Sequence, residues 1–222
     1  MSTTISKAAD LMELVTRMPT DSVLIQHGIS WDEYEELLDA VGEASGLRIS
    51  YDAGTVQIMT LTQEHELYST LIERIVDRLG SYLRIRVLFY GSATLRKQSK
   101  MKGAEPDACF YVQNAGLVGN KKRFDFEIDP PPDVVVEIDL HHDSISKFPI
   151  YAALGVPELW RFYEDSLTIY RLEGEQYLPS EASQALHLLT GALLTEFLRR
   201  STKEDQYDIL LAFEEWLKTQ QQ

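Results

Sequence analysis

Apolar residues recur along the chain with two different spacings, and the wider spacing predicts helices. In residues 31–41 the apolar positions fall every three or four residues, and Ser30 stands where an N-cap belongs. In residues 63–80 they recur every four residues as far as Gly80, and glycine commonly ends a helix. A helical spacing is also found at residues 5–18 and 203–219.

Shorter apolar runs bounded by Gly, Pro, Asn or Asp predict strands. Residues 47–59 read as a hairpin around the turn DAGT, and residues 166–180 as a second hairpin around EGEQ. The three prolines at 130–132 cannot donate backbone hydrogen bonds, so a strand should begin directly after them. Single strands are predicted for residues 82–90, 91–97, 107–112, 133–140 and 157–163.

The remaining segments are a loop and one more helix. Residues 114–129 contain Gly and Asn and show no helical period, which indicates a loop. A helix is expected to begin at a cap formed by Ser144 or Ser146 and to end at Leu154, because Gly155 follows.

This order of elements predicts an α/β protein with a mixed β-sheet flanked by helices, additional hairpins and terminal helices. At 222 residues the chain fits a single domain. Within it we distinguish an N-terminal helical extension (1–45), a core (46–178) and a C-terminal helical extension (179–222).

Composition narrows the setting of the protein. Cys109 is the one cysteine, which excludes an internal disulfide and a zinc site built from cysteines. No apolar run approaches the roughly 18 residues of a membrane-spanning helix. The first residues also lack the basic and apolar pattern of a secretory signal. We therefore expect a cytoplasmic protein that does not associate with a membrane.

Charge is unevenly distributed. The formal net charge is −14, which argues against a simple nucleic-acid coat protein. Between Arg74 and Lys102, however, eight basic residues accompany a single acidic one. This segment is either a local surface for a polyanion such as DNA or a solvated helix face and strand edge. The residues we single out for DNA binding are Arg96, Lys97, Lys100 and Lys102.

Two carboxylates are placed where charge is costly. Asp107 follows Pro106 at the start of a predicted strand, and Glu137 lies late in an apolar one. Carboxylates on adjacent buried strands repel each other and lose hydration, and a bound cation offsets both costs. Mg²⁺ or Mn²⁺ would suit oxygen ligands, to which the main-chain carbonyl of Ile138 could add one. Alternatively, Asp107 forms a turn after proline and Glu137 is half of an ion pair.

Three further residues could complete this site. Lys147 lies near the start of the predicted helix, where a cation is unfavourable unless an anion holds it. Such a lysine could orient or deprotonate an attacking water. Asp139 shares the strand face of Glu137 and could ligate the metal or pair with Lys147. His65, at the start of the helix at 63–80, could reach the metal through water or serve in the helix cap.

The stretches EPDACFYV, PPPDVVVEIDL and KFPIYAALGVPELWRF together resemble the Uma2 family of restriction endonucleases, over roughly residues 28–175. The family is similar to the PD-(D/E)XK nuclease superfamily, so the resemblance implies a restriction-endonuclease-like fold and metal-dependent cleavage of DNA. Asp107 and Glu137 then correspond to the paired acidic metal ligands. Asp139 stands where the superfamily usually has its lysine, and Lys147 would be that lysine, relocated to the following helix.

Two functions from different classes follow. The first is a Mg²⁺-dependent DNA endonuclease, and the alternative is a catalytically idle nuclease-fold module for binding or protein interaction. For the endonuclease, alanine at Asp107 or Glu137 should abolish cleavage at little cost in stability, because it removes like-charge repulsion.

We also predict a homodimer, since cutting both strands needs two sites or a repositioned one. Its interface could use the helices at 31–41 and 203–219, the second through Tyr207, Phe213 and Trp216. Alternatively, these helices pack on their own domain.

Overall fold

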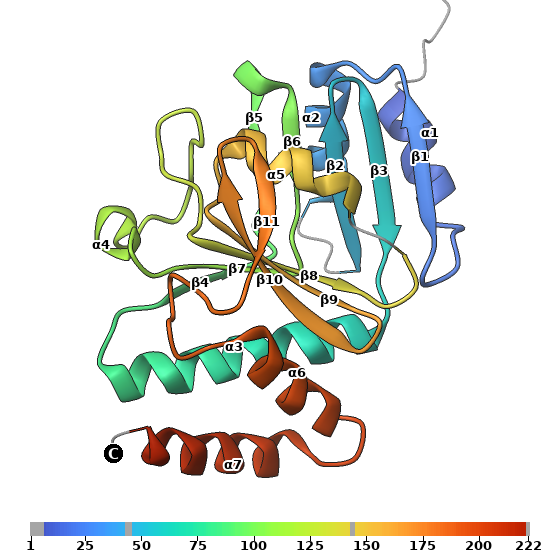
Figure 1. Ribbon diagram of the computed structural model, residues 1–222. Helices are drawn as coiled ribbons and strands as arrows, with labels where there is room; N and C mark the ends of the chain where they lie inside the picture. The colour runs from blue at the N-terminus through green and yellow to red at the C-terminus, as the bar shows by residue number, and fades with distance from the viewer. Residues whose placement is uncertain (1–6, 43–45, 143–144, 221–222) are drawn as a thin grey trace, which may run out of the picture.

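The computed structural model describes residues 7–42, 46–142 and 145–220, and its strands form two sheets (Figure 1). The first sheet is antiparallel and contains, in spatial order, β1 (Val23–His27), β3 (Thr55–Thr60), β2 (Leu47–Asp52), β6 (Lys102–Ala104) and β5 (Leu95–Lys97). The second contains β11 (Gln176–Ser180), β10 (Ser166–Glu173), β9 (Glu158–Tyr163), β8 (Val134–Asp139), β7 (Ala108–Tyr111) and β4 (Leu88–Gly91).

The second sheet is mixed, because β8 runs parallel to β9 and antiparallel to β7. Helices flank both sheets. They are α1 (Lys7–Val15), α2 (Trp31–Val41), α3 (Gln63–Leu83), α4 (Ala115–Val118), α5 (Phe148–Leu154), α6 (Gly191–Arg200) and α7 (Gln206–Thr219), with the 3-10 turns η1 (Gln98–Lys100) and η2 (Ile145–Lys147). The predicted α/β class with a mixed sheet is confirmed, although the prediction did not separate the strands into two sheets.

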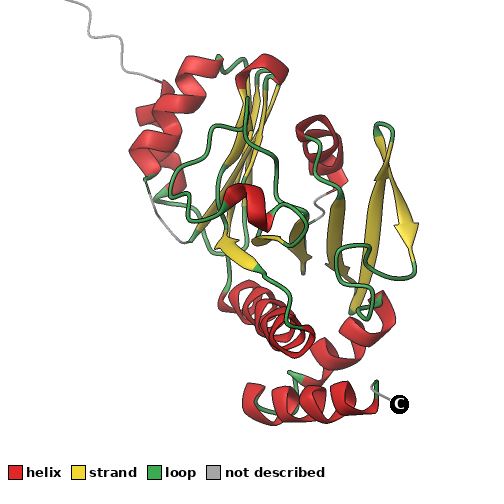
Figure 2. Ribbon diagram, turned by 90° about the vertical axis from the view of Figure 1, so that its left-hand side faces the viewer, coloured by secondary structure: helices red, strands yellow, loops and turns green. Residues whose placement is uncertain are grey.

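The two faces of the second sheet are covered differently. Helices α3, α6 and α7 lie below it in Figure 1 and again below the strands in Figure 2. They enclose a largely apolar core with one face of β8, and its members include Ile72, Ile75, Val134, Val136, Ile138 and Phe213. On the opposite face, α5 lies between the two sheets and packs against β5, β6 and β11.

The first sheet has its own core. Helices α1 and α2 cover its outer face, where Tyr34 and Leu37 pack against Ile49, Tyr51 and Ile58. Because side chains alternate along a strand, the neighbours of Ile49 on β2 point to the other face, toward α5 and the second sheet. The N-terminal region consists of two helices and strand β1, which pairs with β3. The prediction of a helical extension did not include this strand.

Two predicted boundaries were wrong around Gly80. Helix α3 continues to Leu83 and ends at Arg84, which adopts the left-handed conformation with φ 57°. Gly80 lies inside the helix, where Val87 packs closely on it, and a Cβ there would lie 2.9 Å from Val87 Cγ2. The strand predicted for residues 82–90 is therefore reduced to β4.

Other local predictions also need correction. Helix α6 and strands β1 and β6 were not predicted, and the expected loop at 114–129 contains α4. Ser146 does not cap α5, because Lys147 occupies the N-cap position and no side chain caps it. Ser144 lies outside the described residues. The other hairpins and strands are found where their apolar patterns predicted them.

Helices α2 and α7 both cover their own domain. In α7, Phe213 is buried and Trp216 stacks on it, with 5.4 Å between ring centroids, whereas Tyr207 is 69 % exposed. Phe213 and Trp216 are therefore turned inward, as the alternative of packing on their own domain expects, whereas Tyr207 is exposed; an interface through α7 stays a prediction. The homodimer itself stays a prediction. Within the described ranges, no helix combines the length and apolarity that crossing a membrane requires.

Candidate active site

Asp107 and Glu137 come together because β7 and β8 are neighbours. The backbone N–H of Asp107 donates to the Val136 carbonyl at 2.9 Å, and the Ile138 N–H donates to Asp107 Oδ2 at 2.8 Å. On β8, Val136 and Ile138 point into the apolar core, so Glu137 and Asp139 point to the opposite face. Both carboxylates are buried there, beside α5.

Lys147 is bound to Glu137. Its Nζ lies 2.8 Å from Glu137 Oε2, and the exposed fractions of the two side chains are 3 % and 1 %. Tyr151, one turn further along α5, donates its hydroxyl to Glu137 Oε1. The expectation that an anion holds this helix-start lysine is confirmed.

Asp139 has a different partner from the one considered. Arg161 on β9 lies with its Nε 2.5 Å from Asp139 Oδ2, and both side chains are buried. Arg161 reaches this face because Glu137 and Arg161 are register partners on the parallel strands. The possible Asp139–Lys147 ion pair is thus replaced by an Asp139–Arg161 pair.

Arg48 is a residue that the sequence reasoning missed. It lies on β2, on the face opposite Ile49, and its Nε is 3.2 Å from Asp107 Oδ1. Its Nη2 is 3.3 Å from Glu66 Oε1 on α3. An arginine within a buried, alternating strand was the available signal, because an arginine in that setting needs an acidic partner.

His65 is buried at the start of α3. Its Nδ1 lies 2.9 Å from Thr62 Oγ1 and also accepts from the Thr62 backbone N–H at 3.4 Å, as a helix cap. Burial lowers the pKa of His65, although Asp107 and Asp139 act in the opposite direction. The cap is the alternative that we had considered, and a catalytic role for His65 stays a prediction.

Burial dominates the electrostatics of the cluster. It raises the pKa of Glu137 to about 7; Lys147 acts to lower it, while Asp107 and Asp139 raise it further. Burial alone would lower the pKa of Lys147, but Glu137 and Asp107 raise it above the ordinary value, so the lysine is charged. The pKa of Tyr151 is raised well above its usual range by burial and by Glu137. Tyr151 therefore remains a hydrogen-bond donor.

The cluster contains donors that suit a hard cation. Asp107 Oδ1 is buried and accepts no hydrogen bond from the described residues, although Arg48 lies beside it. Within the described part of the chain, no group of three His, Cys, Asp or Glu side chains is placed to hold a metal ion. Mg²⁺ needs fewer protein ligands than that, because it usually keeps several waters and binds one or two carboxylates. The donor set therefore fits a magnesium-like ion.

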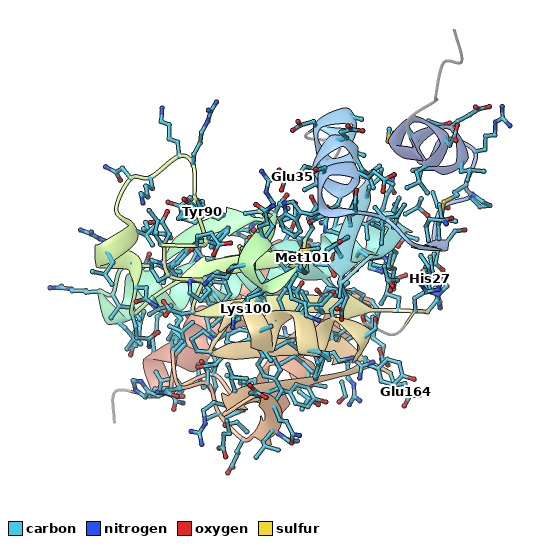
Figure 3. The ribbon with its side chains drawn as sticks, turned by 90° about the horizontal axis from the view of Figure 1, so that it is seen from above. His27, Glu35, Tyr90, Lys100, Met101 and Glu164 are labelled. Carbon is cyan, nitrogen blue, oxygen red and sulfur yellow. The ribbon has the colours of Figure 1, made fainter. Side chains whose placement is uncertain are left out.

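The four basic residues chosen for DNA binding share one hairpin. It consists of β5, η1 and β6, and Figure 3 labels Lys100 and Met101 at its tip. Arg96 Nε is 3.1 Å from Glu35 Oε1, and Lys102 is ion-paired with Asp52. Nearby acids therefore offset part of the charge of this hairpin.

The rest of the basic segment lies elsewhere. Arg74 and Arg78 project from α3 toward α7, where they contact Gln206 and Glu214. The segment from Arg74 to Lys102 is therefore divided between two sides of the molecule, so a single basic stripe does not form (Figure 1).

Comparison with known proteins identifies the family. The model of the Uma2 family, described as "Putative restriction endonuclease", matches residues 31–202, so the chain belongs to this family. A crystal structure of a putative nuclease from Anabaena variabilis is similar to this chain. The match covers 68 % of this chain and 90 % of the chain in that structure, with 14 % sequence identity and a TM-score of 0.46. No curated protein matches the sequence. Family membership supports a nuclease function.

Proposed function

We propose that this protein is a metal-dependent DNA endonuclease that hydrolyses phosphodiester bonds. The observation that carries the proposal is the convergence of Asp107, Glu137 and Lys147 in one buried cluster. These residues come from two adjacent strands and the following helix, and two of them are acids whose mutual repulsion a divalent cation would relieve. Membership of the Uma2 family supports the same chemistry.

Asp107, Glu137 and the main-chain carbonyl of Ile138 would hold Mg²⁺ or Mn²⁺. When bound, such an ion neutralises charge on the phosphate and lowers the pKa of a water ligand. Asp107 would contribute Oδ1, which accepts no hydrogen bond from the described residues, whereas Oδ2 accepts the Ile138 N–H. Asp139 would add negative charge from the neighbouring position on β8, with Arg161 keeping its carboxylate oriented.

Lys147 would orient the attacking water. Its amino group lies against Glu137 and is charged, so it can donate to a water or to a phosphate oxygen held beside that carboxylate. Tyr151 fixes the other oxygen of Glu137, which limits rotation of the carboxylate. His65 could assist only through Nε2, since Nδ1 contacts Thr62 in the cap.

DNA would approach over the β5–β6 hairpin. This hairpin carries Arg96, Lys97, Lys100 and Lys102, and it continues directly through Glu105 and Pro106 into Asp107. Binding of its basic side chains to the phosphate backbone would bring the duplex near the cluster without selecting a sequence. If both strands are cut, a homodimer would supply the second site, and sedimentation as a 25.4 kDa monomer would reject that arrangement.

One observation favours the alternative of a catalytically idle binding or protein-interaction module. Each of the three carboxylates already has a buried cationic partner, namely Arg48 for Asp107, Lys147 for Glu137 and Arg161 for Asp139. An ion-paired cluster of this kind can hold a fold together without binding a metal.

Nicking of supercoiled plasmid distinguishes the two functions. The wild type is compared with Asp107→Asn and Glu137→Gln, in Mg²⁺ or Mn²⁺ and in excess chelator. Glu158→Gln is the matched control, because Glu158 is also a buried carboxylate but bonds Trp160 and the Ala185 N–H outside the cluster. We expect metal-dependent nicking by the wild type and the control, and a loss of at least about 100-fold in the two site variants. Equal nicking by all four proteins would reject the assignment, and no nicking by any would favour the idle module.

A further inference from the structure

The Arg48 side chain connects the inside of the cluster with the surface. It is buried, and it contacts Asp107 Oδ1 with Nε at 3.2 Å and Glu66 Oε1 with Nη2 at 3.3 Å. Its Nη1 donates to the Leu47 carbonyl at 3.0 Å, which anchors the guanidinium to its own strand. The Glu66 side chain is 53 % exposed, whereas that of Asp107 is 1 % exposed.

One oxygen of Asp107, Oδ1, accepts no hydrogen bond from the described residues, and Arg48 lies beside it. Oδ2 accepts the Ile138 N–H, so Oδ1 is the oxygen that a cation would take most readily. A guanidinium at 3.2 Å and a divalent ion cannot both remain on that oxygen, because like charges so close in a buried site repel strongly. Binding of the ion therefore requires the guanidinium to move, and Glu66 offers a carboxylate at the solvent side.

We propose that Arg48 is a resident counter-ion of Asp107, which a divalent cation displaces toward Glu66 when it binds. This inference rests on the metal site of the proposed function. It assigns Arg48 as a positioning residue that offsets the charge of Asp107 when no ion is bound, and Glu66 as the acceptor of the displaced guanidinium. The affinity for the ion is then set partly by the transfer of Arg48 from its contact with both acids to a contact with Glu66 alone.

Calorimetric titration of the full chain with Mn²⁺ alone tests this transfer without any measurement of cleavage. Arg48→Met removes the competing cation, so we expect Mn²⁺ to bind at least about tenfold more tightly than in the wild type. Glu66→Gln removes the acceptor, so we expect several-fold weaker binding. In the double variant, Glu66→Gln should have no further effect, because the residue through which it acts is gone.

Arg161→Met is the matched control, since it removes a buried arginine of the same cluster whose ion pair is with Asp139 and not with Asp107. Equal tightening in Arg48→Met and Arg161→Met would overturn the proposal in favour of a general charge effect. An effect of Glu66→Gln that persists in the double variant would make Glu66 a ligand and also overturn it.

Failure of this inference and failure of the metal site have different signatures. If the wild type binds no Mn²⁺, the metal site itself is wrong and this inference is rejected with it. If the wild type binds Mn²⁺ and Arg48→Met binds it equally, only the role of Arg48 is rejected. Should Arg48→Met not fold, Glu66→Gln still decides, because Glu66 is exposed and an unchanged affinity there overturns the transfer.

Discussion

The two faces of strand β8 are both buried, yet their side chains are stabilised by different interactions. Toward α3, Val136 and Ile138 join an apolar core in which burial itself adds to stability and no partner has to be specific. Toward α5, Glu137 and Asp139 are equally buried but depend on Lys147 and Arg161. Replacing both members of such a pair by apolar residues is often neutral or stabilising.

The comparison therefore separates stability from function within one strand. The apolar face explains why the sheet folds, whereas the charged face is costly and is arranged around groups that can bind or move a charge.

Removal of α7 should have the largest effect, on the apolar side. Truncation after Thr202 removes side chains that lie fully inside the core, and loss of a single one of that size costs about 2–5 kcal/mol. Together their loss is as large as the total stability of a typical domain, about 5–15 kcal/mol. They are Ile209, Leu210, Phe213 and Leu217. We expect no cooperative thermal transition by circular dichroism. A truncated chain that melts cooperatively would mean that α7 is peripheral, and its oligomeric state would then test the dimer interface.

On the charged side, Lys147→Met should be costly at neutral and alkaline pH. It leaves Glu137 buried without its cation, which destabilises a fold by about 3–5 kcal/mol. At about pH 5 the cost should be smaller, because Glu137 then binds a proton. The free energy of unfolding in urea measures both values, and a cost that is independent of pH would show that Lys147 acts through packing alone.

The same reasoning corrects the expectation that alanine at Asp107 or Glu137 costs little stability. Alanine at either position would leave Arg48 or Lys147 buried beside a vacated carboxylate site. The conservative amide variants are therefore the appropriate tests of catalysis.

Protonation of Glu137 should make stability depend on pH. Its pKa is raised by burial from the ordinary value of 4.5 to about 7 in the folded state. The folded protein thus holds this proton more tightly than the unfolded chain does. The resulting stabilisation is complete below about pH 4.5 and disappears as the pH rises through about 7, with a total change of about 3 kcal/mol. In urea titrations, Glu137→Gln should lack this component, and identical pH profiles for the two proteins would contradict the shift.

The smallest effect is expected for the basic side chains of the β5–β6 hairpin, which lie outside the buried cluster. Exchange of Lys97 and Lys100 for glutamine should weaken DNA binding and reduce the slope of log K against log salt by about 0.9 for each phosphate that is no longer neutralised. Arg96 and Lys102, which are paired with Glu35 and Asp52, should contribute less. Fluorescence anisotropy at several salt concentrations measures the slope.

Lys203→Gln is the control for this measurement, because Lys203 is exposed and follows α6 on the other side of the molecule. An equal change in slope in that variant would move the DNA surface away from the hairpin.

Local sequence patterns predicted much of the candidate site. Alternation along residues 133–140 placed Glu137 and Asp139 on one face, and the position of Lys147 at a helix start indicated that an anion holds it. Both follow from backbone geometry and the helix dipole, which act over a few residues. The same patterns predicted the two hairpins and the helices at 31–41 and 63–80, except for the end of α3, where Val87 packs on Gly80.

The sequence by itself thus determined which residues alternate, where most elements begin, and that buried acids must find positive partners. Only the tertiary structure decided which partners these are. Arg48 is far from Asp107 in the chain, and it reaches that residue because β2 pairs with β6, the strand that leads into Asp107. Asp139 binds Arg161 because β8 and β9 pair in parallel with Glu137 opposite Arg161. Strand order and register are set by the packing of the whole chain, so no local pattern contains them.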